Sequence, residues 1–241
     1  MFQTDPFTLI ILFVGLSLLP FVAMVATSYL KIVVVMSLIR NALGIQSIPP
    51  NMVINALAMI LSFYIMAPVM GESWSVLMEA KNARMERAAA VAQTNAAAQE
   101  GVALPAYSGL DVDVADVEKA AEPFREFLSK HTSDRQRAFF INTAERLWAK
   151  EDGTPAKVDP ESFYILIPSF CVSELTKSFQ IGFLVYLPFI AIDIIVSNIL
   201  LAMGMMMVSP VTISLPFKLL LFVMVNGWTL LIQGLIRGYA L

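Results

Sequence analysis

The apolar residues of the chain fall into two blocks, one toward each end, with a polar segment between them. The first block holds two uncharged runs, residues 7–30 and 52–70. Each run is long enough to cross a bilayer as a helix, which takes about 20 apolar residues. Between the runs, Gly44 and the pair Pro49-Pro50 indicate a turn. Residues 1–71 are therefore predicted to form an apolar helical hairpin.

The second apolar block, residues 163–241, is predicted to be another helical hairpin. Residues 163–208 are apolar apart from three charged side chains, and residues 219–236 form the last uncharged run. Proline lacks an amide donor and kinks or ends a helix, so the proline after Ser209 is expected to mark the bend. The prolines expected to kink or end the apolar helices are Pro20, Pro68, Pro168, Pro188 and Pro210.

The polar segment, residues 72–162, is predicted to be a small helical insert, because it lacks the alternation of β-branched and polar residues that strands show. Ser133 and Gln136 have the spacing of a capping box at a helix start. Residues 93–116 are expected to be partly disordered. The helices expected in this insert are residues 73–99, 115–130 and 135–150.

Composition identifies the setting of these helices. Hydrophobic residues make up 58% of the chain and charged residues only 15%, which is more apolar than a typical soluble domain. Residues 72–161 hold 11 Lys and Arg and 16 Asp and Glu, whereas the remaining 151 residues hold only 5 and 3. This distribution indicates a membrane protein with one aqueous domain.

The sequence offers no set of residues for catalysis. It has one cysteine, Cys171, and one histidine, His131, which are too few for a zinc site. It has no Gly-rich phosphate loop and no nucleophile elbow, and its acidic balance argues against nucleic-acid binding. We therefore expect no enzyme activity, metal or cofactor. Cys171 lies in an apolar stretch and is expected to be a small buried residue.

Basic residues near the first hairpin indicate its orientation. No basic residue precedes the first apolar run, whereas a cleaved signal peptide begins with positive charge, so this run is expected to be retained. Lys31 and Arg40 flank the short loop of the hairpin and favour a cytoplasmic position for it, because cytoplasmic loops are enriched in basic residues. The insert would then face the periplasm, although Arg237 weakly opposes this arrangement.

Five charged residues interrupt the apolar blocks, where an ionisable group is costly unless it faces a cavity or a partner charge. Glu174 and Lys177, three residues apart on a helix, are placed to pair locally. Asp193 and Lys218 lie on either side of the predicted bend, so a hairpin would bring them close. Alternatively, these charges lie at helix ends in interfacial water, pair between subunits, or line a polar conduit. The five residues are Lys31, Glu174, Lys177, Asp193 and Lys218.

A methionine tract lies at the predicted bend of the second hairpin, where residues 202–210 read Ala-Met-Gly-Met-Met-Met-Val-Ser-Pro. Methionine is unbranched and its thioether is polarizable, so it repacks against irregular partners. The tract either fills gaps in a buried apolar segment or forms a deformable apolar lining that seals, opens and reseals. Its four methionines are Met203, Met205, Met206 and Met207.

Three stretches of the apolar blocks resemble one known family. They are residues 21–50, with Ser28-Tyr-Leu-Lys-Ile32 and Leu38-Ile-Arg-Asn-Ala-Leu-Gly44; residues 168–183, with Ser173-Glu-Leu-Thr-Lys177; and residues 187–228, with the methionine tract, Leu215-Pro-Phe-Lys218 and Asn226-Gly-Trp228. On these residues the chain resembles the FliP/SctR (YscR) family, the export-gate proteins of flagellar and virulence type III secretion systems. Residues 82–116 of the insert do not align with it.

The resemblance implies an all-α core subunit of the type III export apparatus, which forms the conducting pore for unfolded protein substrates at the bacterial inner membrane. It implies a homo-pentamer that assembles with SctS/FliQ-like, SctT/FliR-like and SctU/FlhB-like subunits into a helical ring complex within the secretion-system basal body. It also implies that the methionine tract is a gasket around the closed pore, with Met205, Met206 and Met207 as its main residues.

Three charged residues match the family, and two features of the sequence differ from its flagellar members. Glu174, Asp193 and Lys218 match charged family positions, and we expect them to pair within or between subunits; if Glu174 pairs with Lys218, charge reversal at both should restore assembly. The absent cleaved signal peptide, and Ser209 where flagellar members usually have proline, favour the virulence injectisome branch over a flagellar homologue. A small-solute membrane transporter is the alternative of another class, but it predicts inverted repeats, which the two unlike apolar blocks do not show.

Overall fold

The computed structural model describes residues 6–45, 48–96, 114–149 and 155–240. Within these ranges the chain is helical and contains no strand, which confirms the predicted all-α class. Residues 97–113, where most of the expected disorder falls, lie outside the described residues. The helices are α1 (Pro6–Val25), α2 (Tyr29–Ala42), α3 (Asn51–Ala96), α4 (Val114–Ala120), α5 (Glu122–His131), α6 (Asp134–Leu147), α7 (Phe163–Ala202), α8 (Pro210–Met224) and α9 (Gly227–Ala240).

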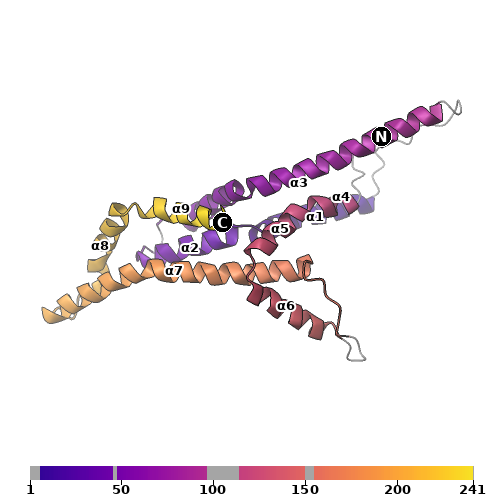
Figure 1. Cartoon of the computed structure of the whole chain (residues 1–241). Coiled ribbons are helices and arrows are strands. Elements are labelled where there is room, and N and C mark those ends of the chain that lie inside the picture. Colours follow the sequence, from indigo (N-terminus) through magenta and orange to yellow (C-terminus); the bar gives the residue numbers. More distant parts are fainter. Residues whose placement is uncertain (1–5, 46–47, 97–113, 150–154, 241) are drawn as a thin grey trace. The chain divides into compact units, whose positions relative to one another are not determined.

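The chain divides into two compact units, of which the first comprises residues 1–20 and 67–130. It contains most of α1, α3 from Ala67 onward, α4 and nearly all of α5 (Figure 1). An ion pair between Arg84 and Asp116 joins α3 to α4. Glu122 and Arg125 form a second ion pair at the start of α5, which is the i,i+3 spacing that brings two side chains together on a helix.

The long helix α3 runs across the predicted boundary between the first hairpin and the insert. It runs from Asn51 to Ala96 without interruption, with Pro68 inside it, so the expected boundary at residues 71 and 72 lies within one helix. The helix formers that follow Pro68, many of them alanine, favour continuation. Loss of one amide donor at Pro68 is evidently not sufficient to end a helix of this length.

The second unit, residues 21–66 and 131–241, is built around α2. The fully buried side chains Ile32, Val35, Met36 and Ile39 of α2 lie at the centre of its apolar core. The first turns of α3, together with α7, α8 and α9, surround this helix through Ala58, Phe189, Phe222 and Leu235, among others. Figure 1 shows α2 between the long α7 and the returning α9.

Close approach of α2 and α7 depends on Gly182. A Cβ atom at this position would lie 2.3 Å from Cδ1 and 3.2 Å from Cβ of Leu38. An alanine would require the Leu38 side chain to rotate away, and the 3.2 Å approach to Leu38 Cβ would require the two helices to separate by a few tenths of an ångström. Gly182 therefore sets the contact between α7 and the central helix, which explains why a glycine is tolerated inside α7 despite its low helix propensity.

We expect Gly182→Ala to lower the free energy of unfolding by up to about 2 kcal/mol, because overpacking costs about 1–3 kcal/mol and the gain in helix propensity returns about 1 kcal/mol. Denaturant unfolding followed by tryptophan fluorescence measures the change. Gly238→Ala is the matched control, because nothing lies within 4 Å of its added Cβ, and it is expected to be neutral or stabilising. A stabilising Gly182→Ala would contradict this account.

The first apolar run is interrupted after Val25, at a place where the sequence analysis expected no interruption. Pro20 lies inside α1, and the helix ends at Val25. At the break, the hydroxyl of Ser62 donates to Thr27 Oγ1 at 3.1 Å, and the hydroxyl of Ser28 donates to Ser62 Oγ at 3.2 Å. Hydroxyl side chains that bond nearby groups compete with helical backbone bonds, so a Thr-Ser pair, rather than the proline, interrupts this helix.

The second apolar block also differs in where it breaks. Helix α7 continues past Pro168 and Pro188, although interruptions were expected there. The run predicted over residues 219–236 is instead divided, because α8 and α9 meet at an angle of 59°. Asn226 between them adopts a positive φ of 51°, a left-handed conformation that asparagine tolerates better than most residues.

Two smaller predictions are also corrected. Ser133 is the N-cap residue of α6 as expected, but its side chain makes no capping bond, so the predicted capping box with Gln136 is absent. The Ser133 hydroxyl instead lies 3.2 Å from the hydroxyl of Ser173 on α7. Cys171, expected to be buried, is only partly buried, and its thiol donates to the carbonyl of Val25.

Candidate functional site: a methionine loop and two buried ion pairs

The methionine tract forms an exposed loop between α7 and α8, at the bend predicted from the sequence. Helix α7 ends in a Schellman motif: Met205 N–H donates to Leu200 O at 3.0 Å, and Gly204 N–H donates to Leu201 O at 3.0 Å. Gly204 has the positive φ, 74°, that this motif requires. Pro210 occupies the first turn of α8, where its missing amide donor costs nothing.

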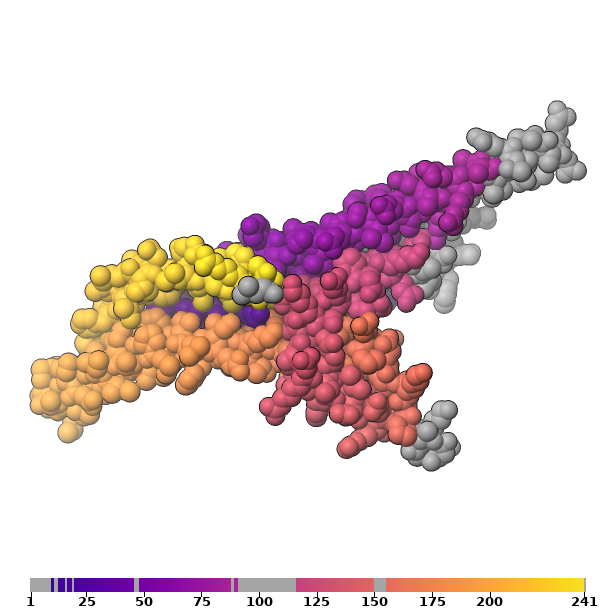
Figure 2. Space-filling model, in the orientation of Figure 1, coloured from indigo at the N-terminus to yellow at the C-terminus, as the bar shows by residue number. Residues whose placement is uncertain are grey.

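The side chains of this loop have almost no partners within the chain. Met206 is 83% exposed and Met207 fully exposed. Met203 and Met205 are also exposed, and the loop lies at the end of the α7–α8 hairpin, away from the α2 core (Figure 2). The loop is therefore not packed in the core of this chain. Four flexible apolar side chains are instead presented outward on a turn that hydrogen bonds hold in place.

The first ion pair cluster is centred on Glu174 in α7, which is fully buried. Lys31 Nζ of α2 lies 2.8 Å from Glu174 Oε2. Lys177 Nζ, one turn along α7, lies 3.0 Å from Oε1. The hydroxyl of Tyr239 in α9 donates to Oε2 as well. One carboxylate thus joins α2, α7 and α9.

Two further contacts complete the Glu174 cluster. Lys31 Nζ lies 3.9 Å from the centre of the Tyr239 ring, within the range of a cation–π interaction. The ring of Tyr239 meets the ring of His131 edge to face at 5.0 Å. Lys177 Nζ also donates to the carbonyl of His131 at 2.7 Å. Each cation is therefore held by more than its contact with Glu174.

The second cluster holds the α7–α8 hairpin together below the methionine loop. Lys218 Nζ of α8 lies 2.6 Å from Asp193 Oδ2 of α7, and the hydroxyl of Ser214 donates to Asp193 Oδ1 at 2.6 Å. Lys218 Nζ also donates to the carbonyl of Ala42, the last residue of α2, at 3.4 Å. The Lys218 side chain is 4% exposed and the Asp193 side chain 34%. This ion pair fixes α8 against both α7 and the end of α2.

Two of the pairings expected from sequence are present in the structure: Glu174 with Lys177, and Asp193 with Lys218. Glu174 and Lys218 are not partners within the chain, because each is buried in a separate cluster with its own counter-ion. Sequence reasoning did not identify Tyr239 or Ser214. Tyr239 and Ser214 lie far from Glu174 and Asp193 in sequence, so no local spacing pattern links them. The only signal was that each places a polar hydroxyl within an apolar run.

The described part of the chain offers no group of three or more His, Cys, Asp and Glu side chains that could hold a metal ion. What its helices offer instead is the length and apolar composition that suit a membrane. Two helical segments, Asn51–Arg87 and Phe163–Ala202, are long and apolar enough to cross a bilayer, and there are up to four such spans if each of two bent helix pairs counts as one.

The sequence is similar to proteins of one known family. The FliP family matches residues 12–235. The Yop proteins translocation protein R of Yersinia pestis is 46% identical over 235 residues, which are 98% of this chain and 97% of that protein. The hypersensitivity response secretion protein HrcR of Ralstonia nicotianae is 47% identical over 232 residues, 96% of each. The virulence protein YscR of Salmonella typhimurium is 42% identical over 239 residues, 98% of each.

Proposed function

The chain belongs to the FliP family, and on this premise we propose that it is a core subunit of the export apparatus of a type III secretion system. Relatives named for Yop translocation, for hypersensitivity response secretion and for virulence support the injectisome branch rather than a flagellar one. Its role is to form part of a conduit, and no catalytic step is assigned to it.

The observation that carries the proposal is the exposure of the methionine loop. In water, four apolar side chains held outward on a hydrogen-bonded turn are unfavourable, so these side chains need lipid, a partner subunit or one another as neighbours. Around a pore, the same side chains from several copies meet one another and seal it. Because methionine repacks easily, these side chains close the pore against one another when it is empty and rearrange around any substrate side chain that passes. Met205, Met206 and Met207 are the main gasket residues on this proposal, with Met203 beside them.

The assembly and location follow from the same proposal. The subunit forms a homo-pentamer with SctS/FliQ-like and SctT/FliR-like subunits and contacts an SctU/FlhB-like protein. It lies at the bacterial inner membrane, in the secretion-system basal body, with residues 72–162 facing the periplasm between the hairpins of residues 1–71 and 163–241. The length and apolar character of α3 and α7 support the membrane location.

The charged residues of the apolar helices serve assembly by fixing how these helices pack within each subunit. Glu174 and Lys218 are both buried and already paired inside the chain, which favours pairing within the subunit over pairing between neighbours. Lys177, whose side chain is 39% exposed, is the member of the set best placed to meet a neighbouring subunit.

Replacing Met205, Met206 and Met207 by alanine should leave assembly intact and make the closed complex leak. Met206 and Met207 are 83% and 101% exposed, and Met205 is 44% exposed, so alanine removes little packing within the chain. Three shorter side chains in each copy, however, leave the pore open. Two quantities are measured: the leakage of ions or small solutes across the inner membrane of cells that express the full apparatus, and the amount of complex purified from them.

The matched control is alanine at Met52, Met59 and Met70, which are also exposed methionines but lie on α3. These substitutions should not increase leakage. Loss of the complex without any leak in the Met205–Met207 variant would return the tract to a packing role. Purification of a monomer that binds a small solute would favour a transporter instead.

A further inference from the structure

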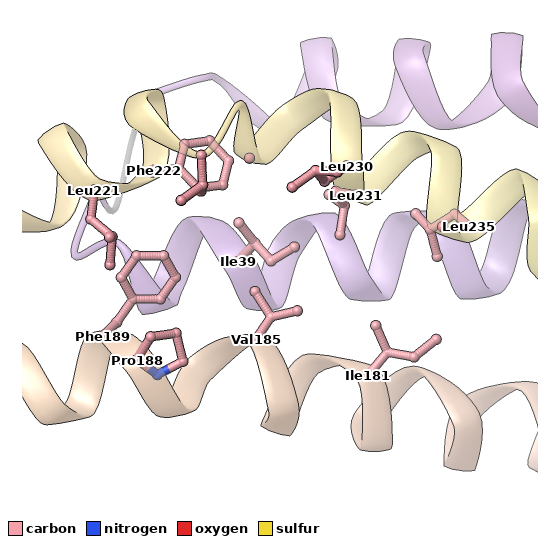
Figure 3. Close-up of a pocket in the computed structure, with 13 residues that line it drawn as sticks. Ile39, Ile181, Val185, Pro188, Phe189, Leu221, Phe222, Leu230, Leu231 and Leu235 are labelled. Carbon is pink, nitrogen blue, oxygen red and sulfur yellow. The ribbon is translucent and has the colours of Figure 1, made fainter.

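An apolar groove, open to the surface, runs along α9 in the second unit. Its volume is about 530 Å³, within the range of about 300–1,000 Å³ that is typical of small-molecule sites. Figure 3 shows side chains from α2, α7, α8 and α9 around it, among them Ile39, Val185, Leu221 and Leu231. All of its lining residues are aliphatic, aromatic, proline or glycine, so an occupant is stabilised by burying hydrocarbon.

Leu230 and Gly234 form the open rim of this groove on α9. Leu230 is 60% exposed and Gly234 is also exposed, and both line the groove. An added Cβ at Gly234 would meet no atom within 4 Å, so the glycine leaves the rim open. The floor, in contrast, is packed, because Leu235 is only 3% exposed. A ligand can therefore enter from the surface without any movement of α9.

An exposed cation, Arg237, lies one turn beyond Gly234. Leu230, Gly234 and Arg237 follow one another at spacings of four and three residues, so they lie on the same side of α9. Within the described ranges Arg237 has no carboxylate partner, whereas each lysine of the apolar blocks has one. It directly follows the last uncharged run of the chain, a position from which arginine extends its charge to the membrane interface.

The Glu174 cluster adds positive charge at the same end of α9. Tyr239, two residues after Arg237, donates to Glu174. That carboxylate is shared by Lys31 and Lys177, so the cluster keeps one excess positive charge. Lys177 is also 39% exposed. One end of the groove therefore favours an anion, whereas its length accepts only hydrocarbon.

We propose that this groove binds an acyl chain of an anionic phospholipid, and that Arg237 binds the phosphate of the headgroup. A guanidinium group suits phosphate because its donors form a planar fork. A small soluble anion would match the charge but leave the groove empty, and an uncharged hydrocarbon would do the reverse. A lipid with a negative headgroup matches both. The inference uses the membrane location of the chain, and it does not depend on the methionine loop being a gasket.

Native mass spectrometry of the complete purified complex tests the headgroup contact. Endogenous lipid is first removed with detergent, and dioleoyl phosphatidylglycerol or dioleoyl phosphatidylcholine, which have the same acyl chains, is then added. The anionic lipid should bind more tightly. Arg237→Gln should weaken its binding about fivefold, the effect of one basic residue near an anionic lipid, and leave phosphatidylcholine unchanged. Arg237→Lys should keep most of the preference, and Arg146→Gln, on an exposed arginine of α6, should have no effect.

A second pair of variants tests the groove itself. Gly234→Leu should lower the binding of both lipids, because its side chain fills the open rim and takes the place of the acyl chain. Gly238→Leu is the matched control, because Gly238 is also an exposed glycine of α9 with no atom within 4 Å of an added Cβ, but it does not line the groove. It should leave the binding of both lipids unchanged.

The inference is overturned if the two lipids bind equally well, if Arg237→Gln keeps the preference, or if Gly234→Leu binds as much lipid as the unmodified chain. It is also overturned if Gly234→Leu prevents assembly and Gly238→Leu permits it, because a neighbouring chain rather than a lipid would then fill the groove. Leakage through the closed apparatus plays no part in these measurements, so failure of the gasket proposal would leave them interpretable.

Discussion

Glu174→Gln is expected to destabilise the subunit by about 3–5 kcal/mol, the cost of removing one partner of a buried ion pair. The substitution leaves Lys31, with 5% of its side chain exposed, as an ammonium group without a counter-ion. It also weakens the acceptor for Tyr239. Denaturant unfolding of the purified complex, and the amount of complex in membranes, measure the effect.

The double variant Glu174→Gln with Lys31→Met distinguishes a lost attraction from a stranded charge. Replacing both members of a buried pair by neutral groups is often close to neutral, so most of the lost stability should return. Glu161→Gln, on an exposed glutamate, should have no measurable effect. A double variant that is as unstable as Glu174→Gln alone would show that the stability comes from the contacts of the Glu174 carboxylate with Lys177 and Tyr239, rather than from avoiding an unpaired Lys31.

Turns were the best predicted part of the fold, because their signals are local. Pro210 marked the bend at the methionine loop, and Gly44 marked the turn after α2; Gly44 and Gly204 both adopt the positive φ of a helix C-terminus. The start of α7 at Phe163 also coincides with the predicted start of the second apolar block. In each case a few neighbouring residues determine the backbone conformation.

Interruptions inside the apolar helices were predicted poorly. The sequence analysis assigned them to proline, but α3 and α7 continue through Pro68, Pro168 and Pro188. The actual breaks lie at Ser28, where hydroxyls bond across to α3, and at Asn226. Whether a proline breaks a long apolar helix depends on how neighbouring helices pack around it, and that information is not local.

The candidate site shows the same division. That Glu174 would pair with Lys177 followed from helix geometry, and that Asp193 would meet Lys218 followed from the hairpin. The stronger contacts of Glu174, with Lys31 and Tyr239, join helices far apart in sequence. A single sequence shows that a buried carboxylate needs a cation, but not which lysine reaches it.

The Asp193–Lys218 pair leads to a prediction with a definite order of effects. Asp193→Asn should cost more stability than Lys218→Met, because it strands an ammonium with 4% exposure, whereas Lys218→Met leaves a carboxylate with 34% exposure that water can reach. We expect a loss of several kcal/mol for Asp193→Asn and about half of that for Lys218→Met. Denaturant unfolding of each purified complex gives the two values.

The combined variant and an exposed control test the cause of this order. Asp193→Asn with Lys218→Met should be more stable than Asp193→Asn alone, because no buried charge remains, and Lys157→Met on an exposed lysine should be neutral. If Lys218→Met proves the more damaging, the contact of Lys218 with the Ala42 carbonyl, rather than its charge pair, holds α8 in place. The anchor of the methionine loop would then be the end of α2, and the position of the loop would depend on α2 more than on its own hairpin.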